Sequence, residues 1–182
     1  MSGGRTRRVF HLVRRFVTSL SPAAPAPADD AWARDILGAE PYALWRRLPN
    51  HDRRHSIAVA RRVQRALERT EHRGDDQWLA AALLHDVGKL DARLGVFGRV
   101  GATLAGAAAG HDMAAIWSEK RGVTRRVGLY LRHPEIGADH IRVAGGPGNA
   151  ARWAAVHHDR DAWESTGIPT PVLIALHDAD DD

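Results

Sequence analysis

Apolar residues recur every three or four positions along most of the chain after residue 28, which is the spacing of one face of an α-helix. The helices that this pattern predicts span about residues 29–37, 41–48, 50–72, 76–87 and 111–121, with later helices near 134, 149 and 171. No stretch of useful length alternates apolar and polar residues as a strand would, and no internal repeat is present. We therefore expect an all-α fold.

The most apolar helical segment is the run WLAAALL, residues 78–84, which ends abruptly in His85 and Asp86. Burying an imidazole and a carboxylate is costly unless another group pairs with them, and a metal cation does this well. Successive residues on a helix point about 100° apart, so these two side chains would hold one ion from two sides or bridge two ions. The alternative is a helix end with solvated polar residues.

The residues on either side of this run indicate where the helix starts and ends. Asp75 or Asp76 can cap the start of the helix, and Gly88 allows the backbone to leave it. Lys89 lies one turn beyond His85 and could meet an anionic substrate. The alternative for Lys89 is an ordinary salt bridge at a helix end.

Composition narrows the chemistry of such a site. The chain has 182 residues, 11 histidines and no cysteine, a size that suits one domain with an appendage. The absence of cysteine excludes disulfides, thiolate zinc sites and cysteine nucleophiles, and ligands that are histidine and carboxylate favour Zn, Fe or Mn. No apolar run reaches the roughly 20 residues that span a bilayer.

Positive charge is concentrated at the N-terminal end. Residues 1–20 contain five arginines and no acid, and without them the formal net charge changes from +4 to −1. In residues 5–20, apolar side chains recur at helical spacing with arginines elsewhere, which predicts a basic amphipathic helix. This helix could dock on the domain, lie on an anionic membrane surface or act as a basic nucleic-acid arm. No pattern of a nucleic-acid-binding module accompanies it, so nucleic acid is not the expected partner.

The segment SPAAPAPA, residues 21–28, contains three prolines and predicts a stiff, extended spacer. We therefore divide the chain into a basic tail with its Pro/Ala linker, residues 1–28, and a domain, residues 29–182. Two arginines interrupt the apolar core that a signal peptide would need. We expect a cytoplasmic protein, peripheral to the membrane if residues 5–20 bind there.

Metal-capable side chains recur at several remote places in the chain, each beside an apolar run. A single histidine on an apolar face is more often a hydrogen-bonded core residue, but this many together favour a shared metal site. The candidate ligands are His55, His85, Asp86, His133, His157, His158 and Asp178. Three further aspartates, residues 180–182, compete with Asp178 for the last position, since all four end one helix and oppose its dipole.

The other histidines occur in the tail, in loops or among charged residues, and we expect them to be solvated. They are His11, His51, His72, His111 and His140. His177 precedes Asp178 but lacks the Gly-Lys sequence that follows Asp86, so we interpret it as incidental.

The order of these residues and the short sequences around them resemble those of the HD-domain superfamily of metal-dependent phosphohydrolases. The resemblance covers about residues 40–182 and is carried by RRHSIAVARRV, LLHDVGK, RHPEIGA, AVHHDR and LIALHDAD. It implies an all-helical bundle and a ligand set for one metal ion, namely His55, His85, Asp86 and Asp178. The two-metal members hold a second ion with extra histidines that His133, His157 and His158 resemble, and Asp86 would bridge the two ions.

The resemblance implies a phosphohydrolase that uses divalent ions, two of them, such as Mn or Fe. Two dications about 3.5–4 Å apart can share a water and lower its pKa towards neutrality, and the hydroxide then attacks phosphorus. We expect a phosphomono- or phosphodiesterase whose substrate is a small-molecule phosphoester such as a nucleotide. Asp86 and Lys89 are the expected catalytic residues. Lys89 and Arg132 are the expected substrate-binding residues, and Arg53 or Arg54 could clamp further phosphates.

Two alternatives from other classes stay open. Mixed-valent di-iron oxygenases of the same superfamily use nearly the same ligands, and oxygen uptake by an iron-loaded sample would distinguish them. A non-catalytic, metal-stabilised binding module would bind metal without turning over any phosphoester. In cyclic di-GMP phosphodiesterases of this superfamily, the doubled histidine is followed by a Gly-Tyr-Pro loop. Residues 167–169 match this loop only in part, so cyclic di-GMP is not the favoured substrate. The sequence does not define an oligomeric state.

Overall fold

The computed structural model describes residues 23–109 and 111–181. All regular structure in this part of the chain is helical, without a strand, so the predicted all-α fold is confirmed. The expected amphipathic helix of residues 5–20 lies outside the described residues. Among the described helices, not one combines the length and the apolar character needed to span a bilayer.

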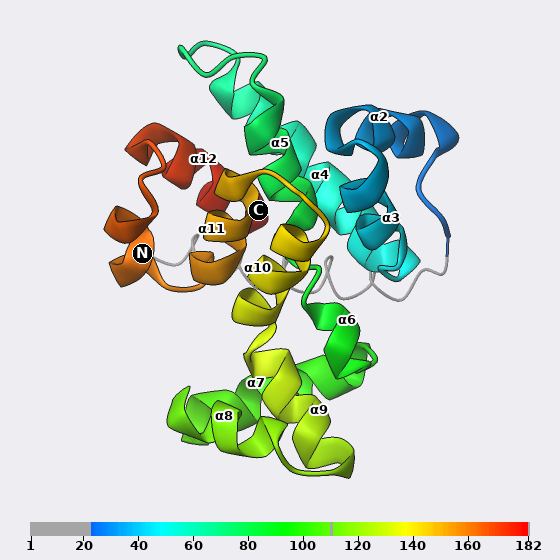
Figure 1. Ribbon diagram of the computed structural model, residues 1–182, viewed down its shortest axis with the longest axis vertical. Coiled ribbons are helices and arrows are strands. Elements are labelled where there is room, and N and C mark those ends of the chain that lie inside the picture. The colour runs from blue at the N-terminus through cyan, green and yellow to red at the C-terminus, as the bar shows by residue number, and fades with distance from the viewer. Residues whose placement is uncertain (1–22, 110, 182) are drawn as a thin grey trace, which may run out of the picture.

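The helices follow one another with short connections (Figure 1). The first half of the chain forms α2 (Pro27–Leu37), α3 (Ala39–Arg46), α4 (Asn50–Leu67), α5 (Asp76–Leu84) and α6 (Lys89–Ala92). The second half forms α7 (Val96–Ala109), α8 (His111–Ser118), α9 (Gly122–Leu131), α10 (His133–Val143), α11 (Gly148–Val156), the 3-10 helix η1 (Arg160–Thr166) and α12 (Thr170–Asp181). Helices α7 and α9 and the 3-10 helix η1 lie in stretches for which the sequence pattern predicts no helix.

Helix α5 forms the centre of the core. Every residue from Trp78 to Leu84 is buried, and α5 packs against α2, α3, α4, α11 and α12. Asp75 caps its start by accepting a hydrogen bond from the backbone N–H of Gln77, which confirms one of the two predicted caps. Each fully buried leucine contributes roughly 1.5–3 kcal/mol. The helix is therefore stabilised by packing on all sides.

Helix α5 ends at Leu84, and residues 85–88 form a turn where the sequence pattern predicts more helix. Gly88 in this turn has φ −65° and ψ −18°, a conformation open to any residue, so it is not needed to release the backbone from the helix. Its role is spatial, because a Cβ at this position would overlap the carbonyl oxygen of His133 and the backbone nitrogen of Gly137. The absent side chain lets the turn pack directly on the start of α10.

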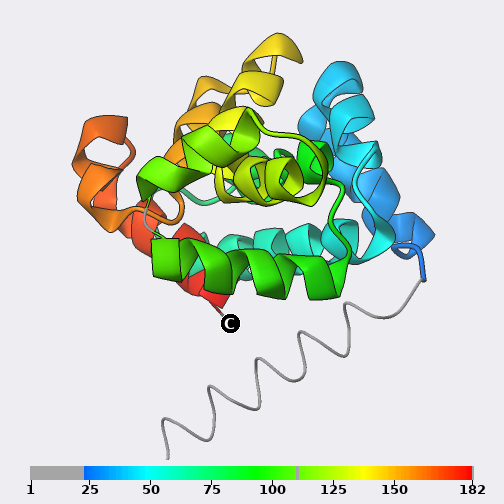
Figure 2. The same ribbon diagram turned by 90° about the horizontal axis from the view of Figure 1, so that it is seen from below.

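Helices α7, α8 and α9 pack on one another and lie below the rest of the bundle in Figure 1. They join it through α6, which contacts α9, and through Arg99 of α7. Both terminal guanidinium nitrogens of Arg99 donate to the Asp52 carboxylate of α4 at 2.7 Å. Seen from below (Figure 2), α2 and α3 lie at one side of the molecule, and η1 and α12 lie at the other.

Candidate metal centre

Two groups of three metal-capable side chains lie where several helices of the bundle meet, with His85, His133 and His157 buried and His158 exposed. The first, which we call the three-histidine group, consists of His133, His157 and His158. The second, which we call the aspartate group, consists of His55, His85 and Asp180. In each group, one ligand atom from every residue lies within 4.8 Å of the others. This is close to the spacing of ligands around one ion, because metal–ligand bonds of about 2.0–2.2 Å place two ligands up to about 4.4 Å apart.

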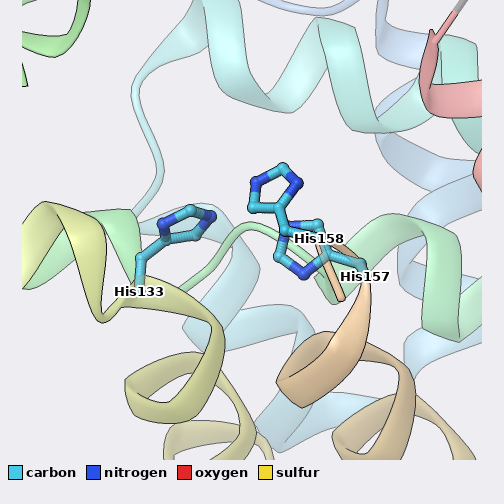
Figure 3. A group of neighbouring side chains, drawn as sticks. All are labelled: His133, His157 and His158. Atoms are coloured by element: carbon cyan, nitrogen blue, oxygen red, sulfur yellow. The ribbon is translucent and has the colours of Figure 1, made fainter. Parts of the chain in front are cut away.

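These ligands come from five different places in the chain. His55 is in α4, His85 follows α5, His133 begins α10, the doublet His157-His158 follows α11, and Asp180 is in the last turn of α12. Figure 3 shows the rings of the three-histidine group turned towards a common space from the start of α10 and the end of α11. The rings of His85 and His157 lie 5.3 Å apart between centroids, so the two groups adjoin.

Asp86 lies between the two groups. Its Oδ1 is 3.4 Å from Nε2 of His133 and 3.7 Å from Nε2 of His157. Its Oδ2 is 3.4 Å from Nε2 of His85. One carboxylate oxygen thus faces each group, which is the arrangement that a bridging ligand needs.

Three of the histidines are held by their backbone neighbours. Nδ1 of His85, His133 and His157 each donates to the backbone carbonyl three residues earlier, at 2.8, 2.6 and 2.8 Å respectively. Because a carbonyl can only accept, Nδ1 carries the hydrogen, and Nε2 is the nitrogen that can offer a lone pair. Metal-ligating histidines are usually oriented by such a second hydrogen bond.

The atoms at the centre of the site are buried and lack hydrogen-bond partners among the described residues. They are Nε2 of His85, Oδ1 of Asp86, Nε2 of His133 and Nε2 of His157. They make up half of all such side-chain atoms in this part of the chain. A buried polar atom without a partner costs about 1–3 kcal/mol. Cations held in the two groups would pair with these atoms, so the residues present fit a metal centre.

The three-histidine group is held in its neutral form. Burial lowers the pKa of His133, and burial together with the adjacent histidines lowers the pKa of His157 well below its usual value. Burial and then the neighbouring His133 lower the pKa of His158 to about 4. Neutral imidazole is the form that binds metal.

The aspartate group shows the opposite behaviour. Burial by itself lowers the pKa of His85, but the carboxylates of Asp86 and Asp180 outweigh it and raise that pKa to about 9. Burial would raise the pKa of Asp180, yet His85 and His55 hold it well below its usual range. The pKa of Asp86 is likewise held low against burial by Lys89 and His85. In the absence of metal, His85 therefore carries a proton at neutral pH.

The predicted ligand Asp178 does not reach the centre. Its side chain is exposed and contacts Nδ1 of the adjacent His177 at 3.2 Å. Asp180 lies in the group instead, with Oδ1 2.8 Å from Nε2 of His55 and 3.6 Å from Nε2 of His85. Residues two positions apart on a helix point about 200° apart. The sequence could have indicated Asp180 as the inward-facing aspartate, because Asp180 continues the buried face of α12 four residues after Leu176.

Lys89 reaches the site, but its ammonium already pairs with the Asp86 carboxylate. Its Nζ donates to Oδ2 of Asp86 at 2.5 Å, and only 15% of its side chain is exposed. Burial by itself lowers the pKa of Lys89, but Asp86, Tyr130 and Asp52 raise it. The salt bridge that was the alternative reading is therefore present, and it places the ammonium next to the candidate metal centre.

The arginines that were expected to bind phosphate have other partners. Arg132 donates to Glu135 at 3.0 Å and to the hydroxyl of Ser118 at 3.2 Å. Arg53 pairs with a carboxylate of α2, and Arg54 donates to a backbone carbonyl just before α2. The described contacts do not bring any of the three to the centre.

One ion pair near the centre was not predicted. Burial works to lower the pKa of Arg99, but its bonds to Asp52 and the charge of Asp86 raise it, so Arg99 lies within electrostatic reach of Asp86. Arg99 and Asp52 are 47 positions apart, and no local pattern links them.

The expectation of solvated histidines needs correction for those that the structure describes. His51, His72 and His140 are each partly buried, and Nε2 of His140 lies 3.1 Å from the Asp91 carboxylate. The side chains of His11 and His111 lie outside the described residues. None of the three described side chains belongs to either ligand group.

Comparisons with models of protein families, with curated proteins and with solved structures found no match. The inference of function therefore depends on the geometry and chemistry of the centre.

Proposed function

We propose that this chain is a metal-dependent phosphohydrolase of the HD-domain type, which uses two divalent ions such as Mn or Fe to hydrolyse a nucleotide or a related small phosphoester. The main support is that three buried histidine Nε2 atoms, which lack hydrogen-bond partners among the described residues, converge on the carboxylate of Asp86. The three-histidine group would hold one ion and the aspartate group the other.

The bound ions would supply an acidified water and stabilise charge on the phosphoryl oxygens. The chain itself would orient the histidine rings and keep the Asp86 carboxylate charged. The backbone carbonyls that accept from Nδ1 fix the rings of His85, His133 and His157. Asp86 stays ionised because Lys89 keeps its pKa low despite its burial.

Lys89 is suited to a second task. Its ammonium has three donors, and the contact with Asp86 at 2.5 Å uses one of them. A substrate phosphate at the centre would lie within reach of the other two. Charge-assisted hydrogen bonds of this kind are about twice as strong as neutral ones.

The test uses the full-length protein, stripped with a chelator and reloaded with Mn or Fe. We expect metal-dependent hydrolysis of one or more members of a panel of phosphomonoesters, phosphodiesters, nucleotides and cyclic dinucleotides. Chelation should abolish it, and the variant Asp86→Asn should lack it.

Two other results would overturn the proposal. Full metal occupancy without turnover of any phosphoester would favour a metal-stabilised binding module. Oxygen uptake by the iron-loaded protein, coupled to cleavage of an organic substrate, would favour a di-iron oxygenase.

A further inference from the structure

A small cavity of about 110 Å³ adjoins the candidate metal centre on the side of α11, η1 and α12. Its lining includes His157, His158 and Asp180, which belong to the two ligand groups. Arg160, His177 and Asp181 line it as well. A group in this cavity would therefore lie close both to candidate ligands of the metal centre and to a guanidinium.

Arg160 is an exposed residue of η1, and its contacts differ from those of the arginines described above. Arg53, Arg99 and Arg132 each pair with a carboxylate. Arg160 lies over the ring of Trp163, with its guanidinium carbon 4.8 Å from the ring centroid. It makes no ion pair or hydrogen bond with any of the described residues. Its donors are thus available to a ligand.

The carboxylates around the cavity already have histidine partners. Asp180 contacts His55 at 2.8 Å, and Asp181 lies 3.8 Å from Nε2 of His177. The ring of His177 packs edge-on against Trp163 with centroids 5.3 Å apart. This packing supports the indole on which Arg160 lies, so the guanidinium has a fixed platform.

The chemistry of this wall matches an oxyanion. A guanidinium placed over an aromatic ring still has N–H donors in its own plane, and two of them can bind two phosphate oxygens at once. The volume of about 110 Å³ is well below the roughly 300–1,000 Å³ of pockets that enclose drug-sized ligands. A compact group would fit this space, whereas a nucleoside would not.

We propose that this cavity binds a terminal phosphate of the substrate, with Arg160 as its anchoring residue, so that the protein prefers phosphomonoesters or nucleoside polyphosphates to phosphodiesters. This inference rests on the proposed phosphohydrolase function. A terminal phosphate carries one ester bond, and its free oxygens can enter a small cavity. A phosphodiester has two ester bonds and therefore fewer free oxygens for the guanidinium to bind.

The first test measures binding alone. Inorganic phosphate is titrated by calorimetry into the Mn-loaded, full-length wild type, Arg160→Gln, Arg160→Lys and Arg125→Gln. Arg125 is exposed on α9, outside the cavity, and serves as the matched control. We expect Arg160→Gln to weaken phosphate binding about ten-fold or more, Arg160→Lys to weaken it less, and Arg125→Gln to leave it unchanged. Metal content should be equal in all four proteins.

The second test compares p-nitrophenyl phosphate with bis(p-nitrophenyl) phosphate. Arg160→Gln should raise KM for the monoester with little change in kcat, and it should change diester hydrolysis less than about two-fold. Equal phosphate affinity in Arg160→Gln and wild type, or no phosphate binding by the wild type, would overturn the cavity assignment even if hydrolysis is observed. Arg160-dependent phosphate binding without any hydrolysis would support the cavity while refuting the proposed function.

Discussion

The three-histidine group and the aspartate group each offer three ligand atoms, yet they differ in charge and in acid–base behaviour. In the first group, burial lowers the pKa of every histidine, to about 4 for His158. In the second group, two nearby carboxylates raise the pKa of His85 to about 9. Burial dominates where no carboxylate belongs to the group, and ion pairing dominates where one does.

This difference has a consequence for metal binding. Ligand histidines must be neutral, so metal competes with protons for them. The three-histidine group is already in the binding form at pH 7. The aspartate group must first lose the proton of His85, but it gains more from a dication because Asp180 is ionised. The affinities of the two groups for a metal ion should therefore depend differently on pH.

The largest effect is expected at Asp86, which serves both groups. Asp86→Asn keeps the shape of the side chain but removes the charge that faces all three neighbouring histidines. We expect the metal content to fall from about two ions per chain to near zero and hydrolysis to fall by more than about 100-fold. Elemental analysis of the purified variant measures the first, and a phosphoester assay measures the second. Normal metal content would show that Asp86 is not the bridging ligand.

The next largest effect should separate two aspartates of one helix. Asp180→Ala removes the carboxylate of the aspartate group, whereas Asp178→Ala changes an exposed side chain of the same type two positions away. We expect Asp180→Ala to lose about one metal ion per chain and most of its activity, while Asp178→Ala keeps both. The reverse pattern would restore the ligand that the sequence suggested and contradict the position of α12.

A smaller effect is expected at His158, the most exposed member of the three-histidine group. His158→Ala leaves His133 and His157 in place, so the ion in this group should bind at least about ten-fold more weakly while the aspartate group keeps its ion. Titration of Mn into the chelator-treated variant, followed by the metal-to-protein ratio, distinguishes the two sites. Equal weakening of both ions would mean that the groups are not separate.

The smallest effect concerns pH and the metal-free protein. The pKa values of His133, His157 and His158 are lower in the folded protein than in the unfolded chain. The unfolded chain therefore binds more protons below about pH 6.5, and the free energy of unfolding should fall as the pH drops from about 6.5 towards 4. Urea unfolding of the chelated protein across this range measures it.

His85 gives a contribution of opposite sign, since its folded-state pKa is raised to about 9. Its stabilising effect is present below about pH 6.5 and is lost as the pH rises through about 9. At pH 7.5, metal uptake should release roughly one proton from the aspartate group. Calorimetry in two buffers with different ionisation enthalpies measures this release. Zero proton release would contradict the ion pairing described for His85.

The fold could be predicted from the sequence where the signal was local. The apolar run 78–84 and its Asp75 cap defined the central helix, because both the burial and the capping hydrogen bond involve near neighbours in sequence. The end of that helix could not be placed, since the turn at Gly88 depends on contact with α10. Helix α9 was also missed, and among its residues Gly128 alone is fully buried, so it contributes little to the core.

The site was partly predictable for similar reasons. His55, His85, Asp86, His133, His157 and His158 each stand beside an apolar run, and the structure brings their side chains together. Asp178 was predicted as the ligand because it lies in the short sequence LIALHDAD, which carries the resemblance. The buried face of α12 favours Asp180 instead. The Asp52–Arg99 pair and the packing of Arg160 on Trp163 depend on tertiary contacts, which no spacing in the sequence reveals.

The most direct measurement is the electron paramagnetic resonance spectrum of the full-length protein loaded with Mn(II), recorded together with its metal content. Two ions bridged by Asp86 should give about two Mn per chain and an exchange-coupled spectrum. A single uncoupled Mn signal, or no uptake of metal at all, would contradict a two-ion centre built from these remote side chains.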